Sequence, residues 1–225
     1  MSISDNVNEI VNHVDAAVAA STYSHKKTEI IAVTKYVDAD VARNVFDSGQ
    51  ITHIAENRVD LFLDKQEKLA DLDLTWHLIG NLQRRKVKDV INKVDYFHAL
   101  DNVKLAAEID KRAEHIIKCF LEINVSGEES KHGFANSELD NVLAELVKFD
   151  KVEIVGLMTM APFDANDNQL DEIFGQLKKL QVEIAAKNLK NVPCTELSMG
   201  MSRDYQKAIE HGATFVRIGS DFFKK

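Results

Sequence analysis

The sequence predicts an α/β fold, a single (β/α)8 barrel that spans residues 1–225 as one domain. Three observations carry this prediction. The length of 225 residues suits a short barrel, because such barrels begin at about 200 residues. Short apolar segments rich in Val and Ile alternate with amphipathic helical segments, which is the pattern of a parallel sheet. No Pro-rich or low-complexity linker interrupts the alternation, which favours one domain.

Eight apolar segments are expected to form the strands, since strands buried on both faces are almost continuously hydrophobic. They are residues 29–35, 53–57, 75–80, 96–100, 116–125, 153–160, 195–199 and 214–219. Apolar residues at helical spacing predict a helix over 5–20 before the first strand and seven helical segments between the strands. Too few residues follow the last strand to form a helix. We therefore expect the 5–20 helix to cover the gap that is left there.

Helix start and stop signals support these boundaries. Asp38 and Asp40 open the helix after the first strand, and Gly49 closes it. Asp101 is expected to cap the helix after the fourth strand. Ser202 is expected to cap a short helix that ends near residue 212. The segment 82–91 is read as a basic helix whose charged face is solvated.

Composition narrows the classes of function. The chain holds 28 Lys and Arg against 36 Asp and Glu, a formal charge of −8. This acidic balance disfavours nucleic acid and anionic membrane surfaces as partners. Cys119 and Cys194 lie far apart in or beside strands, which fits buried thiols of a reduced, cytoplasmic protein. The N-terminal residues lack the features of an export signal, and the histidines follow no metal-ligand spacing, so no metal is expected.

Lys35 is the first candidate for chemistry. It ends the first strand, and parallel barrels carry their active residues at the carboxyl ends of the strands. An amine at the mouth of an apolar barrel is poorly hydrated and shifts toward its neutral, nucleophilic form. A neutral lysine can form a Schiff base with an aldehyde, whereas the alternative is an ordinary solvated loop residue.

A phosphate site is expected at the ends of the last two strands. The seventh strand supplies Ser198 and Gly200, and the eighth supplies Gly219 and Ser220. Barrels often bind phosphate with these two loops and a nearby helix N-terminus. Glycines let the backbone approach an anion closely, although both glycines could instead serve only to shape turns.

Three further side chains fall near the same end. Arg217 lies within an apolar strand and needs an acceptor if it is buried, for which Glu56 and Glu196 are candidates. His77 in the third strand either lies beside the pocket or is a core histidine. Met199 is expected to line the pocket or the core.

Several stretches together resemble a known family. They are 31–35 (IAVTK), 55–58 (AENR), 76–86 (WHLIGNLQRRK), 121–126 (LEINVS), 156–160 (GLMTM), 197–202 (LSMGMS) and 216–219 (VRIG). In this order they are similar to the pyridoxal phosphate homeostasis protein family, also called YggS/PROSC. The resemblance covers nearly the whole chain. It implies the barrel of alanine racemase, which is the type III fold of pyridoxal phosphate (PLP) proteins, without that enzyme's second domain.

The resemblance also implies roles for individual residues. Lys35 would hold PLP as a Schiff base, and Arg217 would face the pyridine nitrogen. Asn57 and His77 would line the ring site. The phosphate would be bound by Ser198, Gly219 and Ser220, together with the backbone near Met199 and Gly200.

The function implied is cofactor storage and transfer in intracellular PLP (vitamin B6) homeostasis, without substantial catalysis. A guanidinium that faces the pyridine nitrogen leaves it unprotonated, which makes the ring a weaker electron sink. The partners expected are PLP and apo-forms of PLP enzymes, and the protein is expected to be a monomer. Two alternatives remain open: a PLP-dependent amino-acid racemase or decarboxylase, and a Schiff-base aldolase barrel. Class I aldolases commonly place their lysine on strand six, where this sequence has 158–160 (MTM).

Overall fold

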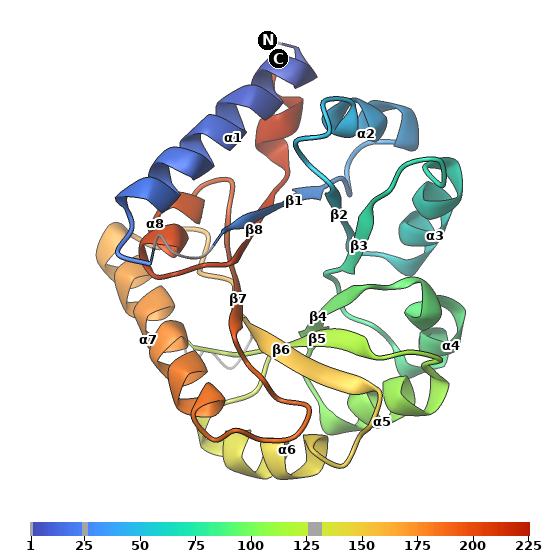
Figure 1. Ribbon diagram of the computed structural model, residues 1–225, viewed down its shortest axis with the longest axis vertical. Helices are drawn as coiled ribbons and strands as arrows, with labels where there is room; N and C mark the ends of the chain where they lie inside the picture. Colours follow the sequence, from blue (N-terminus) through green and yellow to red (C-terminus); the bar gives the residue numbers. More distant parts are fainter. Residues whose placement is uncertain (1, 24–26, 126–131) are drawn as a thin grey trace.

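The computed structural model describes residues 2–23, 27–125 and 132–225 and confirms the barrel (Figure 1). Eight parallel strands pair in sequence order, and the last pairs with the first to close the sheet. They are β1 (Glu29–Val33), β2 (His53–Glu56), β3 (Thr75–Leu78), β4 (Tyr96–Leu100), β5 (Ile117–Glu122), β6 (Val152–Met158), β7 (Glu196–Met201) and β8 (Phe215–Ile218).

Helices surround the strands, as Figure 1 shows. The α-helices are α1 (Ile3–Ala20), α2 (Ala39–Phe46), α3 (Val59–Lys68), α4 (Val87–Val90), α5 (Val103–Arg112), α6 (Leu139–Leu146), α7 (Asp167–Ala185) and α8 (Tyr205–Glu210). Short 3-10 turns are η1 (Arg84–Lys86), η2 (Ile91–Lys93), η3 (Asn136–Glu138) and η4 (Ser220–Phe223). The alternation of strand and helix therefore follows the sequence prediction. Residues 126–131, between β5 and η3, lie outside the described residues.

Three local expectations are corrected. The segment 82–91 is not one helix, because a single α-turn stands there between two 3-10 turns. Its buried positions include Val87, Val90 and Ile91, whose β-branched side chains weaken helix propensity. The cap of α5 is Asn102, whose side chain accepts from Leu105 N at 2.8 Å, and not Asp101.

The third correction concerns Ser202. Helix α8 begins only at Tyr205, preceded by Asp204, so Ser202 is not its cap. Asp204 Oδ1 accepts from the backbone N–H of Met201 at 2.6 Å, which forms a turn between β7 and the helix. The Ser202 hydroxyl is used elsewhere, since it accepts from Gly219 N at 3.3 Å. Ser202 therefore links the ends of β7 and β8.

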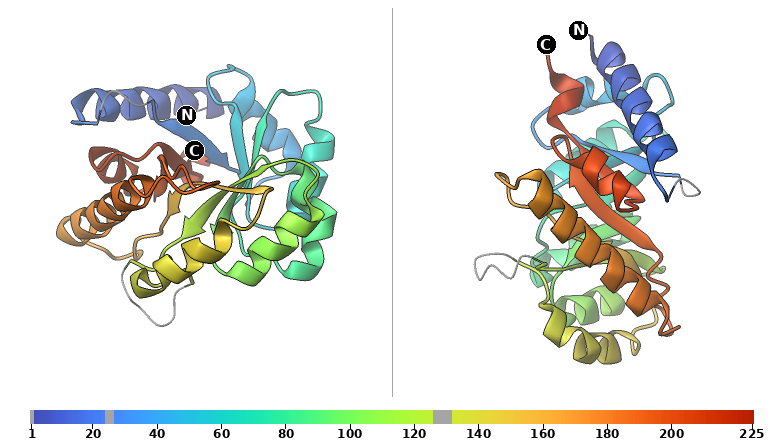
Figure 2. Two further views of the ribbon diagram at one scale, coloured as in Figure 1. Left: turned by 60° about the horizontal axis from the view of Figure 1, so that its bottom comes forward. Right: turned by 90° about the vertical axis from the view of Figure 1, so that its left-hand side faces the viewer.

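Helix α1 occupies the gap after β8, as expected. It packs against α2 on one side and against α8 and η4 on the other. Figures 1 and 2 show α1 running beside the C-terminal segment, with the two chain ends next to each other. The buried residues of α1 include Val7, Ile10 and Val14, which recur at helical spacing on the inner face.

Asn6 fastens the two ends of the chain together. This buried amide donates through Nδ2 to Phe222 O at 3.0 Å and to Lys224 O at 2.9 Å. Replacing it with alanine leaves the buried Phe222 carbonyl without this donor, which costs about 1–3 kcal/mol of unfolding free energy. Urea denaturation of Asn6→Ala measures the loss. Asn8→Ala, an exposed change on the same helix, is the control and is expected to stay within about 0.5 kcal/mol of the parent.

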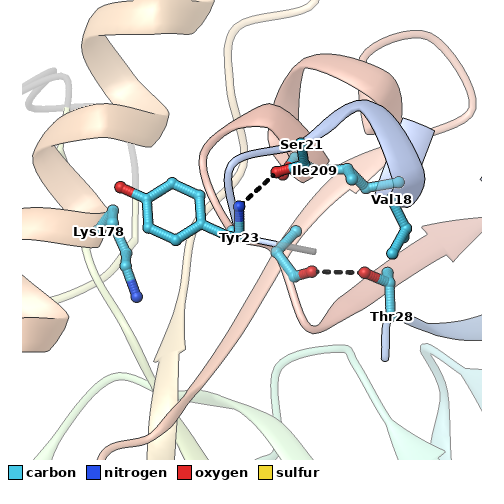
Figure 3. A pocket seen from close by; sticks show the side chains of 8 residues that line it. Val18, Ser21, Tyr23, Thr28, Lys178 and Ile209 are labelled. Carbon is cyan, nitrogen blue, oxygen red and sulfur yellow. Dashed lines mark hydrogen bonds between the residues drawn. The ribbon is translucent and has the colours of Figure 1, made fainter. Parts of the chain in front are cut away.

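The N-terminal end of the barrel contains a recess below the last turn of α1 (Figure 3). Thr28 Oγ1 donates to Ala213 O at 2.8 Å, and Tyr23 N donates to Ser21 Oγ at 3.1 Å. Lys178 Nζ lies 5.2 Å from the centroid of the Tyr23 ring. The Thr28 hydrogen bond ties the start of β1 to the start of β8, and the Lys178 contact joins α7 to the turn after α1. They lie at the end of the barrel opposite Lys35.

Two general features of the described residues complete the fold. None of the described helices combines the length and the hydrophobicity that a membrane crossing requires. Cys119 and Cys194 are both free thiols in the interior. Burial raises the pKa of Cys194 to about 12 and that of Cys119 further, so both stay protonated and unreactive at neutral pH.

Candidate functional site

Lys35 lies at the carboxyl end of β1, in the turn that leads to α2. Side chains alternate along a strand, and the register sets Ile31 beside Arg217 of β8, so Ile31 and Val33 belong to the inward face that Lys35 continues. The lysine is half-buried, and its Nζ lies 5.0 Å from the centroid of the Tyr36 ring. The prediction that Lys35 stands at the mouth of the barrel agrees with this position.

A buried polar cluster braces the residue before Lys35 from the outer side of the barrel. Lys65 of α3 donates to Thr34 O at 2.7 Å and forms a buried ion pair with Glu56. Thr34 Oγ1 donates to the same Glu56 oxygen at 2.6 Å. The cluster fixes the peptide at Thr34. The side chain of Lys35 therefore projects from a backbone whose preceding residue is held in place.

Arg217 is buried in β8, on the inward face that also carries Phe215. It donates to Ser198 Oγ at 2.5 Å and to Thr159 O at 3.0 Å. The expectation that Glu56 or Glu196 pairs with it is wrong. Glu56 is engaged by Lys65, and Glu196 accepts from Thr195 Oγ1 at 2.8 Å. Burial lowers the pKa of Arg217 to about 10, so it remains a cation at neutral pH.

Glu122 is a candidate site residue that was not predicted from the sequence. It ends β5 with only 5% of its surface exposed, on the same inward face as Phe120. Burial raises the pKa of Glu122 and Asp101 adds to this, while Arg217 acts in the opposite direction. Among the described residues, its Oε2 has no hydrogen-bond partner. A glutamate directly after an apolar strand segment was the signal available in the sequence.

The end of β7 brings three of the predicted residues together. Ser198, Met199 and Gly200 are all buried. The Ser198 hydroxyl is shared by Arg217 and His98 inside the barrel. Gly200 has φ +91°, and a Cβ there would lie 2.7 Å from Ala208 Cβ. The backbone conformation and the close packing of α8 therefore both require glycine at this position. As a result, no side chain at position 200 covers the backbone of this turn.

The remaining predicted residues lie closer to the surface. Gly219 is half-buried directly after β8, and Ser220 is exposed as the first residue of η4. Asn57 is exposed directly after β2. Their positions at the carboxyl ends of strands agree with the expected site. The assignment of phosphate and ring contacts to them stays a prediction.

His77 belongs to a hydrogen-bonded chain of histidines in the barrel interior. Its Nε2 lies 2.8 Å from His53 Nδ1, and its Nδ1 lies 2.8 Å from His98 Nε2. His98 Nδ1 lies 2.9 Å from Ser198 Oγ. His53 and His98 were not singled out from the sequence. For His98 the signal was present, because it stands between Phe97 and Ala99 in a strand that is buried from Phe97 onward.

The comparisons with known proteins identify first the class of barrel. Residues 4–224 match the family model described as the alanine racemase N-terminal domain. The alanine racemase of Corynebacterium glutamicum shares the fold, with a TM-score of 0.71 at 15% identity over 98% of this chain and 60% of that one. The site therefore lies on an alanine racemase-type barrel.

Three further relatives narrow the class. The pyridoxal phosphate homeostasis protein of Aquifex aeolicus is 36% identical over 99% of this chain and 98% of its own. The human protein of that name is 37% identical over 86% of this chain and 75% of its own. PipY of Synechococcus elongatus, solved with PLP bound, has a TM-score of 0.85 at 30% identity and covers 99% of this chain and 100% of its own. The chain belongs to the pyridoxal phosphate homeostasis protein family.

The residues at the mouth fit such a cofactor. Lys35 supplies an amine, and Arg217 supplies a permanent cation deeper in the barrel. The turn at Gly200 leaves backbone uncovered by a side chain. The unpartnered Oε2 of Glu122 is a buried acceptor that interacts electrostatically with Arg217 and has no partner within the described chain. A buried acceptor of this kind is costly unless a ligand or water satisfies it.

Proposed function

We propose that this protein binds PLP at the mouth of its barrel through a Schiff base on Lys35, and that it serves intracellular PLP homeostasis. One observation carries the proposal. Lys35 stands at the carboxyl end of β1, braced through Thr34, on a strand that pairs with β8 and its buried Arg217, in a family that includes a PLP-bound PipY structure. The Schiff base forms when the Lys35 amine condenses with the aldehyde of PLP and releases water.

The other predicted residues take roles around this link. Arg217 faces the pyridine nitrogen and, because a guanidinium does not give up its proton, leaves that nitrogen unprotonated. Asn57 borders the ring. The phosphate is received at the strand ends that carry Met199, Gly200, Gly219 and Ser220. Ser198 forms hydrogen bonds with Arg217 and His98 and therefore supports the site from the interior of the barrel.

Holding the cofactor is favoured over turnover for an electronic reason. Bound PLP supplies an electron sink, and its strength depends on protonation of the pyridine nitrogen. Arg217 is held in place by Ser198 and Thr159 O and disfavours that protonation. We therefore propose a cytoplasmic monomer that stores PLP and releases it to apo-forms of PLP enzymes.

Reductive trapping tests the Lys35 link. We expect borohydride treatment of PLP-loaded protein, followed by peptide mass mapping, to place a single pyridoxyl adduct on Lys35. Lys35→Arg keeps the charge but cannot form a Schiff base, so it should lose the adduct and the visible absorbance. Lys27→Arg, an exposed change at the opposite end of β1, is the control and should retain both. An adduct on another lysine in the parent protein contradicts the proposal.

The racemase alternative predicts a different result from the same loaded sample. Incubation with L-alanine in deuterated water should then give rapid exchange of the α-proton with inversion, abolished in Lys35→Arg. For a storage protein we expect slow or absent exchange, together with transfer of PLP to an apo-enzyme added to the mixture.

A further inference from the structure

A line of hydrogen-bonding side chains runs through the barrel interior from Arg217 to His53, and Glu29 lies next to its far end. At the cofactor end Arg217 donates to Ser198 Oγ, which lies 2.9 Å from His98 Nδ1. Two histidine–histidine contacts of 2.8 Å follow, from His98 to His77 and from His77 to His53. At the N-terminal end His53 Nε2 lies 3.7 Å from Glu29 Oε2.

The two ends together set the direction of this line. At one end a guanidinium is only a donor, so Ser198 Oγ accepts from Arg217. At the other end the Glu29 carboxylate favours a hydrogen on His53 Nε2, so Nδ1 of each histidine is the acceptor and Ser198 turns its own hydrogen to His98 Nδ1. His98 is then protonated at Nε2 and donates to His77 Nδ1. By the same logic His77 Nε2 donates to His53 Nδ1. In this state the hydrogen of Ser198 is committed to His98 and is not offered to a ligand.

The rings are held so that protons can shift while the rings stay in place. His77 stacks on Tyr96 with centroids 4.8 Å apart and planes inclined by 6°. His98 stacks on Phe120 at 4.4 Å, and Phe215 contacts both imidazoles. Burial lowers the pKa of His77 and of His98 well below the ordinary value, so both remain neutral. Each therefore has one donor and one acceptor nitrogen.

Protonation of His53 reverses the line. The imidazolium carries hydrogens on both nitrogens, so its Nδ1–H must face a bare His77 Nε2. His77 then holds its hydrogen on Nδ1, and His98 Nε2 becomes the acceptor. His98 Nδ1–H in turn donates to Ser198. Ser198 Oγ now accepts from both His98 and Arg217, and its own hydrogen is free to point to a ligand. Each hydrogen thus moves one place toward His53, and the single proton taken from water enters at Ser198 Oγ, so that the net gain is the imidazolium of His53.

We propose that His53, His77 and His98 are positioning residues that couple protonation of His53, at the N-terminal end of the barrel, to the hydrogen-bond direction of Ser198 at the cofactor site. The statement that Ser198 faces a PLP site rests on the proposed function. The hydrogen-bonded line of side chains is independent of that function.

The charges around His53 place this switch on the acid side of neutrality. Burial lowers the pKa of His53, and Lys27 lowers it further. Glu29 of β1 and Asp95, which precedes β4, act in the opposite direction. At the other end Arg217 is the cation that faces His98. Because the folded-state pKa is below the ordinary value, the reversed line is populated only as the pH falls beneath about 6.5.

Long-range 1H–15N NMR of histidine-labelled, PLP-free protein reads the tautomers directly. Above neutral pH we expect His77 and His98 to carry their hydrogen on Nε2. As His53 is protonated, both should change to Nδ1–H with the same midpoint as His53, while neither becomes charged. Titration of His53 without a tautomer change at His98 would overturn the proposal.

His53→Gln is the matched variant. A glutamine amide can accept from His77 and donate toward Glu29, but it cannot take up the proton. The half-buried site at the end of the line should tolerate it, and circular dichroism verifies the fold. We expect His98 in this variant to keep Nε2–H at every pH. A persistent tautomer change would show that His53 is not the group that drives it.

A binding measurement links the line to the site. PLP affinity of the parent, relative to His53→Gln at the same pH, should rise about tenfold across the titration of His53, the gain from one charge-assisted hydrogen bond. Dividing the affinity of the parent by that of His53→Gln at each pH cancels the effect of the titration of the PLP phosphate, which is the same for both proteins. A ratio that does not change with pH overturns the coupling to the cofactor. Loss of the Lys35 adduct would instead concern only the proposed function, since the NMR experiment uses no PLP.

Discussion

Replacing Lys65 with methionine is expected to lower the unfolding free energy by about 3–5 kcal/mol, because it leaves the carboxylate of Glu56 buried without its cation. Glu56 is fully buried and Lys65 is 2% exposed. Methionine keeps most of the aliphatic part of the lysine side chain. The loss of unfolding free energy is therefore due to the missing charge and not to a cavity. The same change removes one of the two donors to the carbonyl of Thr34, the residue before Lys35, and should therefore also weaken PLP binding.

Two companion variants distinguish the loss of the buried ion pair from the general effect of removing a charge from α3. Lys68→Met removes an exposed lysine of the same helix, which pairs with Asp64 at 2.8 Å, and should cost less than about 1 kcal/mol. Adding Glu56→Leu to Lys65→Met removes the stranded carboxylate and should recover much of the loss. Urea unfolding of the single and double variants gives the comparison. Equal losses in Lys65→Met and Lys68→Met would contradict the account.

Gly80→Ala is expected to be the most damaging small substitution near the site. Gly80 follows β3, and a Cβ there would lie 2.0 Å from the backbone oxygen of Asn57. The clash is with backbone, so the loop after β2 must move. Overpacking of this kind costs about 1–3 kcal/mol or more, and we expect loss of PLP affinity because Asn57 is displaced. Denaturation and PLP titration measure the two effects.

The same substitution in α7 should have the opposite sign. A Cβ at Gly175 would lie 3.6 Å from the His211 ring, an ordinary contact. Alanine in the interior of a helix is favoured over glycine by roughly 0.5–1 kcal/mol, so Gly175→Ala should stabilise the protein. If Gly80→Ala proves as well tolerated as Gly175→Ala, the close approach of Gly80 to Asn57 does not hold the site together.

Much of the fold was predictable because hydrophobic periodicity is a local property. Each strand of this barrel is a short apolar run between amphipathic helices, and β4 was predicted to the residue. Caps were less predictable. Asp101 and Asn102 are both good capping residues, and only the backbone decides which of them reaches Leu105 N.

The interior of the site was much less predictable, because it depends on register. His53, His77 and His98 are separated by 24 and 21 residues in sequence, yet consecutive rings hydrogen-bond in the barrel. Which residues of neighbouring strands share a layer follows from the stagger of a closed sheet, which periodicity does not encode. The partner of Arg217 was mistaken for the same reason, since Ser198 meets it across the shifted register of β7 and β8.

The pairing of β1 with β8 also has a consequence for synthesis on the ribosome. β1 ends at Val33, and the strand that completes its outer edge begins at Phe215. Because translation proceeds at about 5–20 residues per second, this edge of β1 stays unpaired for roughly ten to forty seconds after it has been synthesised. An apolar strand with an open edge is a template for pairing with other chains. α1 emerges before β1, but part of its packing surface is η4, which emerges last. The interval between β1 and β8 is therefore the stage at which nascent chains of this protein are most exposed to aggregation and most in need of a chaperone.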